Sequence, residues 1–201
     1  MTAYFVITHG SSSPRSVLWR QEVEHYLQSL CPRLVVGGGC LEGQPLSLQA
    51  QISAFIAALP AHTKTIVIPL FLLQGVHTQV DIPSQIPRER CLLTPLLGEH
   101  PGMLDLLAAQ FPPTGTRVLL CHGSSYPGAM TIVSRLAQKL HAQLLTLADP
   151  LPPGAHVLPY FLAGSYVLSK IPKQGINLLP SPLTPPIVAK MAQDLAASLL
   201  E

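Results

Sequence analysis

The chain has 201 residues, of which 48% are apolar and only 11% are charged, and its net charge is +2. A membrane-spanning helix needs about 20 consecutive apolar residues, but the most apolar run, residues 65–73, is far shorter and contains Pro69. No Lys/Arg run indicates a nucleic-acid partner, and the N-terminus lacks the basic flank of a signal peptide. We therefore expect a cytoplasmic protein with a sizeable core and no contact with membranes.

Proline and hydrophobic periodicity divide the first half of the chain into alternating strands and helices. Apolar runs rich in β-formers predict strands over residues 4–8, 34–41, 65–73 and 91–94. Helical spacing predicts helices over residues 14–30, 45–59 and 101–110, and a short helix or turn over 84–90. Such alternation, with continuously apolar strands, is typical of a parallel sheet that helices cover on both faces.

The sequence then repeats itself, which predicts an α/β fold made of two related parallel-sheet halves. Residues 4–12, with His9-Gly10-Ser11-Ser12 at their end, return as residues 117–125, with His122 in the place of His9. Residues 66–72 return as residues 156–162, and Tyr166 then stands for His77. We expect a first half over residues 1–112 and a second half over residues 113–201.

The second half is degenerate. The span from His122 to Tyr166 is about two dozen residues shorter than the span from His9 to His77. A proline-rich link over residues 149–155 replaces the counterpart of the helix over residues 45–59. His122 keeps its strand–His–Gly–Ser setting, but Tyr166 stands for His77 and no glutamate stands for Glu42. We therefore interpret His122 as a relic with a structural role.

Three side chains that suit a metal ion, His9, Glu42 and His77, each follow a predicted strand. The carboxyl ends of parallel strands meet at one edge of a sheet, where such folds bind ligands. Two imidazoles and a carboxylate suit Fe²⁺, Co²⁺, Ni²⁺ or Zn²⁺, and three ligands leave coordination positions open. Each residue alone also has a structural interpretation; for Glu42 it is an acid at the start of the helix that Pro45 opens.

These motifs resemble the sirohydrochlorin cobaltochelatase or ferrochelatase family, in its longer, two-half form. The resemblance covers the first half in order and rests on four segments: Thr8-His9-Gly10-Ser11-Ser12, Leu41-Glu42-Gly43-Gln44-Pro45, residues 69–77 followed by Asp81-Ile82-Pro83, and residues 95–101. The combination of Gly-Val-His with Asp-Ile-Pro is the most specific of them. Gln79 and Val80 depart from the pattern, because a charged residue often stands before that aspartate.

The resemblance implies a chelatase fold and an enzyme of the lyase class that inserts Co²⁺ or Fe²⁺ into sirohydrochlorin, on the way to sirohaem or cobalamin. Ni²⁺ stays open as a third ion. The resemblance implies that neither an organic cofactor nor ATP is needed, and it implies metal-binding roles for His9 and His77. Glu42 matches the acid of the Glu-Gly-x-Pro pattern, and as a carboxylate near the metal it would accept protons. We expect a monomer whose two halves act as a pseudo-dimer.

Gly10 allows a ligand to approach the backbone closely, and the serines after it supply hydroxyl and N–H donors. Together they predict a substrate-binding surface. Its candidate residues are Ser11, Ser12, Arg15, Gln74, Gly75 and Val76. The substrate carries eight carboxylates, and the candidates to bind them are Arg15, Arg88, Arg90 and Lys170.

Other functions have less support. The chain has no G-x-S-x-G elbow for a serine hydrolase, no arginine before His9 for a histidine phosphatase, and no phosphate-binding P-loop. The cysteines Cys31, Cys40, Cys91 and Cys121 form no C-x-x-C pair, which indicates free thiols rather than a zinc or iron–sulfur site. A metal or tetrapyrrole carrier with the same fold and no turnover would use the same histidines, so it remains the alternative.

Overall fold

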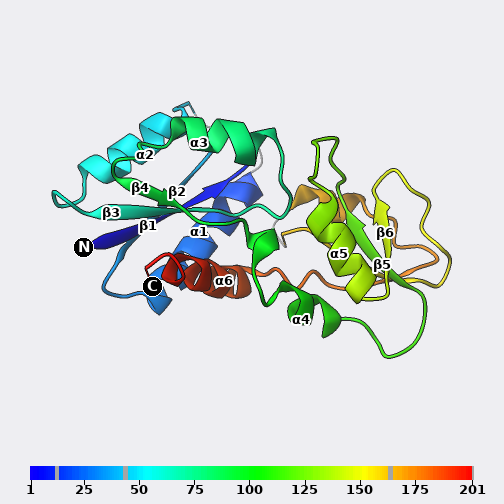
Figure 1. Cartoon of the computed structure of the whole chain (residues 1–201). Helices are drawn as coiled ribbons and strands as arrows, with labels where there is room; N and C mark the ends of the chain where they lie inside the picture. Colours follow the sequence, from blue (N-terminus) through cyan, green and yellow to red (C-terminus); the bar gives the residue numbers. More distant parts are fainter. Residues whose placement is uncertain (12–13, 43–44, 163–164, 201) are drawn as a thin grey trace.

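The computed structural model describes residues 1–11, 14–42, 45–162 and 165–200, and for Tyr166 the backbone alone. It contains two four-stranded parallel sheets, one in each half of the chain (Figure 1). The first has the order β2-β1-β3-β4, and the second repeats it as β6-β5-β7-β8. Their strands are β1 (Thr2–Thr8), β2 (Val35–Cys40), β3 (Lys64–Pro69), β4 (Cys91–Leu93), β5 (Arg117–Cys121), β6 (Gln143–Thr146), β7 (His156–Pro159) and β8 (Asn177–Leu178). The identical order confirms the predicted pair of related parallel-sheet halves.

Helices cover both faces of the first sheet because alternate side chains of its buried strands point to opposite faces. Tyr4 and Val6 pack towards α1 (Pro14–Leu30) and α6 (Pro185–Ala197), whereas Phe5 and Ile7 pack towards α2 (Leu48–Ala57). The short helix α3 (Ile82–Gln85) lies on the same face as α2 (Figure 1). The helix α6 returns from the end of the chain to pack against α1, and the sequence analysis did not predict it.

The second sheet is less completely covered. Helix α5 (Thr131–Lys139) packs on one face, and the short helix η3 (Tyr166–Lys170) contributes Val167 and Leu168 to the other. No helix connects β6 to β7, so the predicted loss of one helix from the degenerate half is confirmed. The helices η2 (Leu97–Glu99) and α4 (Met103–Ala108) lie between the sheets along the chain, and α4 contributes Met103 and Leu107 to a core shared by both halves.

Several predicted boundaries differ from the observed ones; the short helix expected over residues 84–90, for example, is α3 at Ile82–Gln85. Two of the differences have a clear physical cause. Strand β3 ends at Pro69 rather than at residue 73, because the following apolar residues leave the sheet and line a cavity. Helix α2 begins at Leu48 rather than at Pro45, since the Ser47 side chain accepts a hydrogen bond from the Ala50 N–H and caps the helix there. Among the described helices, none combines the length and the apolar character that crossing a bilayer requires.

Candidate metal site and cleft

The backbone pairing of β1 with β2 brings His9 beside Glu42. The parallel ladder continues past the strand ends, where Leu41 N–H donates to the Thr8 carbonyl (3.2 Å) and Glu42 N–H donates to the His9 carbonyl (2.9 Å). The two side chains therefore start from neighbouring backbone positions at the carboxyl edge of the sheet.

Gly10 makes this close pairing possible. Its φ is +86°, a left-handed conformation that favours glycine, and a Cβ added there would lie 2.0 Å from the Glu42 carbonyl oxygen. Only a residue without a side chain allows the two loops to approach in this way.

His77 reaches the same edge from a different element. After β3 the chain runs through a loop to Gly75, whose N–H donates to the Thr78 hydroxyl (3.0 Å), and the Thr78 N–H donates back to the Gly75 carbonyl (3.2 Å). This turn starts the π-helical segment η1 (His77–Asp81), and His77 is its first residue. The sequence predicted that His77 follows a strand end, but not that a helical turn presents it.

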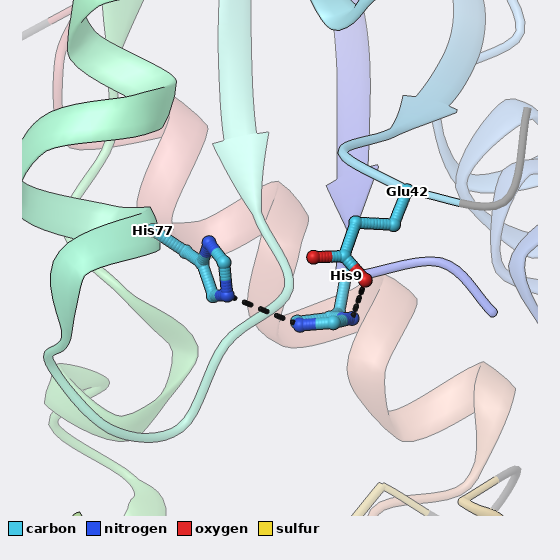
Figure 2. Close-up of side chains that lie close together, drawn as sticks. All are labelled: His9, Glu42 and His77. Carbon is cyan, nitrogen blue, oxygen red and sulfur yellow. Dashed lines mark hydrogen bonds and ion pairs between the residues drawn. The ribbon is translucent and has the colours of Figure 1, made fainter.

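The three predicted side chains converge (Figure 2). The Nε2 atoms of His9 and His77 are 3.2 Å apart, with their rings nearly perpendicular, and His9 Nδ1 lies 3.9 Å from Glu42 Oε2. One potential ligand atom from each residue lies within 4.8 Å of the other two. About half of the His9 side chain is exposed, so the cluster is open to solvent.

The hydrogen bonds of the two imidazoles determine which nitrogens carry protons. His77 Nδ1 lies 2.7 Å from Asp81 Oδ2, and His9 Nδ1 lies 3.1 Å from the Gly10 carbonyl oxygen. Carbonyl and carboxylate oxygens only accept, so both Nδ1 atoms are the donors. With both Nδ1 atoms protonated, the 3.2 Å contact between the two Nε2 atoms is a hydrogen bond when one of them also carries a proton. When both rings are neutral, a cation between the Nε2 lone pairs would take the place of that proton.

The spacing also suits one shared ion. Histidine nitrogens bind first-row metals at roughly 2.0–2.1 Å, so two of them on one tetrahedral or octahedral ion stand roughly 2.9–3.4 Å apart. The observed 3.2 Å between the two Nε2 atoms falls in that range. Glu42 is near enough to supply an oxygen to the same ion after a side-chain rotation.

Asp81 belongs to this site although the sequence analysis assigned it no function. It lies four residues after His77, one helical turn away, and its carboxylate orients the His77 ring. When a carboxylate accepts a hydrogen bond from the second ring nitrogen of a metal-binding histidine, it fixes the tautomer of that histidine and raises the basicity of the ligand nitrogen. The i, i+4 spacing of His77 and Asp81 was the signal that could have identified it.

A cavity of about 600 Å³ adjoins the two histidines, and both halves of the chain line it. Of the predicted substrate-binding residues, Ser11, Gln74 and Gly75 line the cavity, whereas Val76 and Arg15 are exposed and do not. Ser12 lies outside the described residues. Most of the wall is apolar or weakly polar; its lining includes Trp19, Leu70, Phe71, Leu72, Leu73, His122, Gly123, Ser124, Tyr160, Phe161 and Leu162.

The basic candidates do not gather at the cavity, since no arginine or lysine is among its described lining residues. The proposal for Arg90 was wrong, because its guanidinium donates to the Thr63 carbonyl (3.3 Å), beside the amino end of β3. That end lies at the opposite edge of the sheet from His9. Arg88 and Lys170 are exposed. All four cysteines are free and buried, as predicted.

Comparison with a family model named CbiX gives a match over residues 3–113, which is more than half of the chain. A sirohydrochlorin cobaltochelatase from Methanopyrus kandleri is 30% identical over 89 residues. The match spans 44% of this chain and 61% of that relative, so less than two thirds of the relative's length is covered.

Two solved structures share the fold across nearly the whole chain. SirB from Bacillus subtilis with Fe³⁺ superposes with a TM-score of 0.74 at 18% identity, covering 98% of this chain and 94% of that one. The sirohydrochlorin chelatase SirB from Bacillus subtilis subspecies spizizenii, in complex with cobalt, has the same score and coverage at 19% identity. The likeness extends over both sheets and therefore includes the degenerate half.

Proposed function

Because the chain belongs to the CbiX family, we propose that it is a chelatase that inserts a divalent metal ion, Co²⁺ or Fe²⁺, into sirohydrochlorin. The observation that carries the proposal is the 3.2 Å approach of the Nε2 atoms of His9 and His77, with the Glu42 carboxylate beside them. The metal ion is a substrate, and its three proposed ligands are His9, His77 and Glu42.

The geometry suits transient rather than permanent binding. Three protein ligands leave open coordination positions to which pyrrole nitrogens can add. The cluster is exposed beside the cavity, so the ion can leave the protein ligands for the macrocycle without crossing a packed core. Glu42 adds negative charge that attracts the incoming cation.

The macrocycle would lie in the cleft with its ring against the apolar wall. Burial of the ring face against side chains such as Phe71 and Phe161 supplies binding energy. Because the described lining contains no arginine or lysine, the carboxylates of the substrate would point to the cleft mouth and to solvent. Ser11, Gln74 and Gly75 offer polar contacts within the lining.

One polypeptide supplies both walls, so we propose that the enzyme works as a monomer. Residues 1–112 would carry the metal ligands and residues 113–201 would complete the cleft. We place the reaction in the cytoplasm, since four free and buried thiols suit a reducing compartment. No organic cofactor has a role in this proposal.

The decisive experiment mixes the pure protein, sirohydrochlorin and Co²⁺, Fe²⁺ or Ni²⁺, and follows the absorption spectrum of the tetrapyrrole. A chelatase accelerates metallation over the protein-free rate, whereas a carrier binds without accelerating it. We expect His9→Ala and His77→Ala each to lower the rate by at least about 10²-fold with an unchanged circular dichroism spectrum. Wild-type rates in either folded variant would refute the proposed site.

A further inference from the structure

His122 occupies the same backbone position in the second half as His9 does in the first. Thr8 pairs with Cys40 at the end of β1, and Cys121 pairs with Thr146 at the end of β5, so each histidine directly follows a corresponding strand. The glycine after each histidine is left-handed, with φ of +86° at Gly10 and +82° at Gly123. The conformation that presents the imidazole has therefore been retained.

The neighbouring ligand residues that would make His122 part of a metal site have not been retained. The strand register places Ala148 where the first half has Glu42. The neighbouring carboxylate of Asp149 accepts hydrogen bonds from both the N–H and the hydroxyl of Thr146, at 2.7 and 2.8 Å, and these bonds lower its pKa. Within the described residues, the cluster of His9, Glu42 and His77 is the only potential metal site.

His122 nevertheless lies at the cavity. It is exposed and lines the same cavity as His9 and His77, but on the wall that the second half contributes. Among the described residues of that wall, it is the one imidazole, and a neutral imidazole has a ring-nitrogen lone pair that can accept a proton. Tyr160 is the other titratable group there, and burial raises its pKa, so it stays protonated.

Metallation needs such a base. Two pyrrole N–H bonds must break, and their electron pairs stay on nitrogen and become metal–nitrogen bonds. A cation that approaches one face of the macrocycle repels the two protons towards the other face. Bases on the metal side, such as Glu42, would have to receive protons past the incoming ion.

We propose, on the premise of the chelatase function above, that His122 is the base that removes the pyrrole protons from the face opposite the metal. Its neutral imidazole accepts the first proton through a ring-nitrogen lone pair and becomes imidazolium. Because the side chain is exposed, it passes that proton to water and then accepts the second. Two protons reach solvent for each ion inserted, and no oxidant or reductant is required.

The test compares His122→Ala and His122→Asn with the wild-type protein. Single-turnover metallation should slow by about 10²-fold in both variants, which is the scale of general base catalysis. Binding of Co²⁺ should stay at one ion per chain with unchanged affinity. Sirohydrochlorin affinity, measured by quenching of the single tryptophan, Trp19 in the cavity wall, should change less than about twofold. Added imidazole should restore the rate of His122→Ala, after correction for its effect on the wild type.

The control is His25→Ala, which removes an exposed histidine on α1 outside the cavity lining and should keep the wild-type rate. Wild-type rates in both His122 variants, or slower rates explained by lost Co²⁺ binding or lost sirohydrochlorin binding, would overturn the role of His122. A wild-type protein that does not accelerate metallation would instead refute the chelatase function itself.

Discussion

At the scale of single residues, a carboxylate beside the two proposed metal-binding imidazoles would act through its charge. Glu42→Gln keeps the shape of the side chain but removes that charge, so we expect metallation to slow by about tenfold or more. Stability should not change, because Glu42 is exposed and Ser47, not Glu42, caps helix α2. The rate and the urea midpoint should be measured together, with Glu22→Gln on the exposed side of α1 as control. An unchanged rate would show that Glu42 has no part in the chemistry.

Asp81 allows a second test at this scale. Asp81→Asn places an amide next to His77 Nδ1, which can donate a hydrogen bond and favour the wrong tautomer. We expect Co²⁺ affinity to fall by about 10- to 100-fold, the usual effect of losing such an orienting carboxylate. Calorimetric titration measures this, and Asp105→Asn, at an exposed position of α4, should leave affinity unchanged. Wild-type affinity in Asp81→Asn would mean that packing alone orients the ring.

At the scale of elements, the site depends on two loops that touch at Gly10. In Gly10→Ala the new Cβ would lie 2.0 Å from the Glu42 carbonyl oxygen, and its φ of +86° would be strained. The loop after β2 must therefore move, which separates Glu42 from His9. We expect a loss of Co²⁺ binding and activity with the sheet intact, seen by calorimetry and circular dichroism. Gly154→Ala, at a left-handed position with open space around it, controls for strain alone. Equal Co²⁺ affinity in both variants would contradict this account.

The end of strand β3 shows where a hydrophobic pattern predicts the wrong element boundary. Residues 65–73 read as one strand because they are continuously apolar, but the strand ends at Pro69, and the last backbone bond to β1 is the one that the Leu70 N–H donates to the Ile7 carbonyl (2.8 Å). Leu70 to Leu73 are apolar because they line the cleft. A one-dimensional pattern reports burial and does not distinguish a sheet from a ligand-binding wall. By contrast, the helix over residues 14–30 was predicted with its observed bounds, since Pro14 and Pro32 punctuate it.

At the scale of the whole molecule, α6 joins the two halves into one core. Its buried face packs on α1 and shares a hydrophobic cluster with strands of both sheets. Leu195→Ala removes a side chain that is 5% exposed, so we expect the free energy of unfolding to fall by about 2–4 kcal/mol. Leu200→Ala, at a position 57% exposed, should cost less than about 0.5 kcal/mol. Urea denaturation compares them, and equal midpoints would show that α6 does not stabilise the fold.

The sequence alone determined the features that depend on local pattern and on repetition. Alternating apolar strands and amphipathic helices imply parallel sheets, the internal repeat implies two halves, and strand-end positions single out His9, Glu42 and His77. The shortened span after β6 even predicted the missing helix. Each of these inferences needs only the chain order and the rule that the carboxyl ends of parallel strands share an edge.

Only the tertiary structure decided what depends on distances between segments far apart in the chain. It set the 3.2 Å between the two Nε2 atoms, the pairing of His77 with Asp81 and the packing of α6 on α1. It also placed His122 in the wall of the same cavity, where a base becomes useful, although the pattern alone suggested a relic. Hydrophobic periodicity indicates which face of a helix or strand is buried. Which other element covers that face depends on how the whole chain packs.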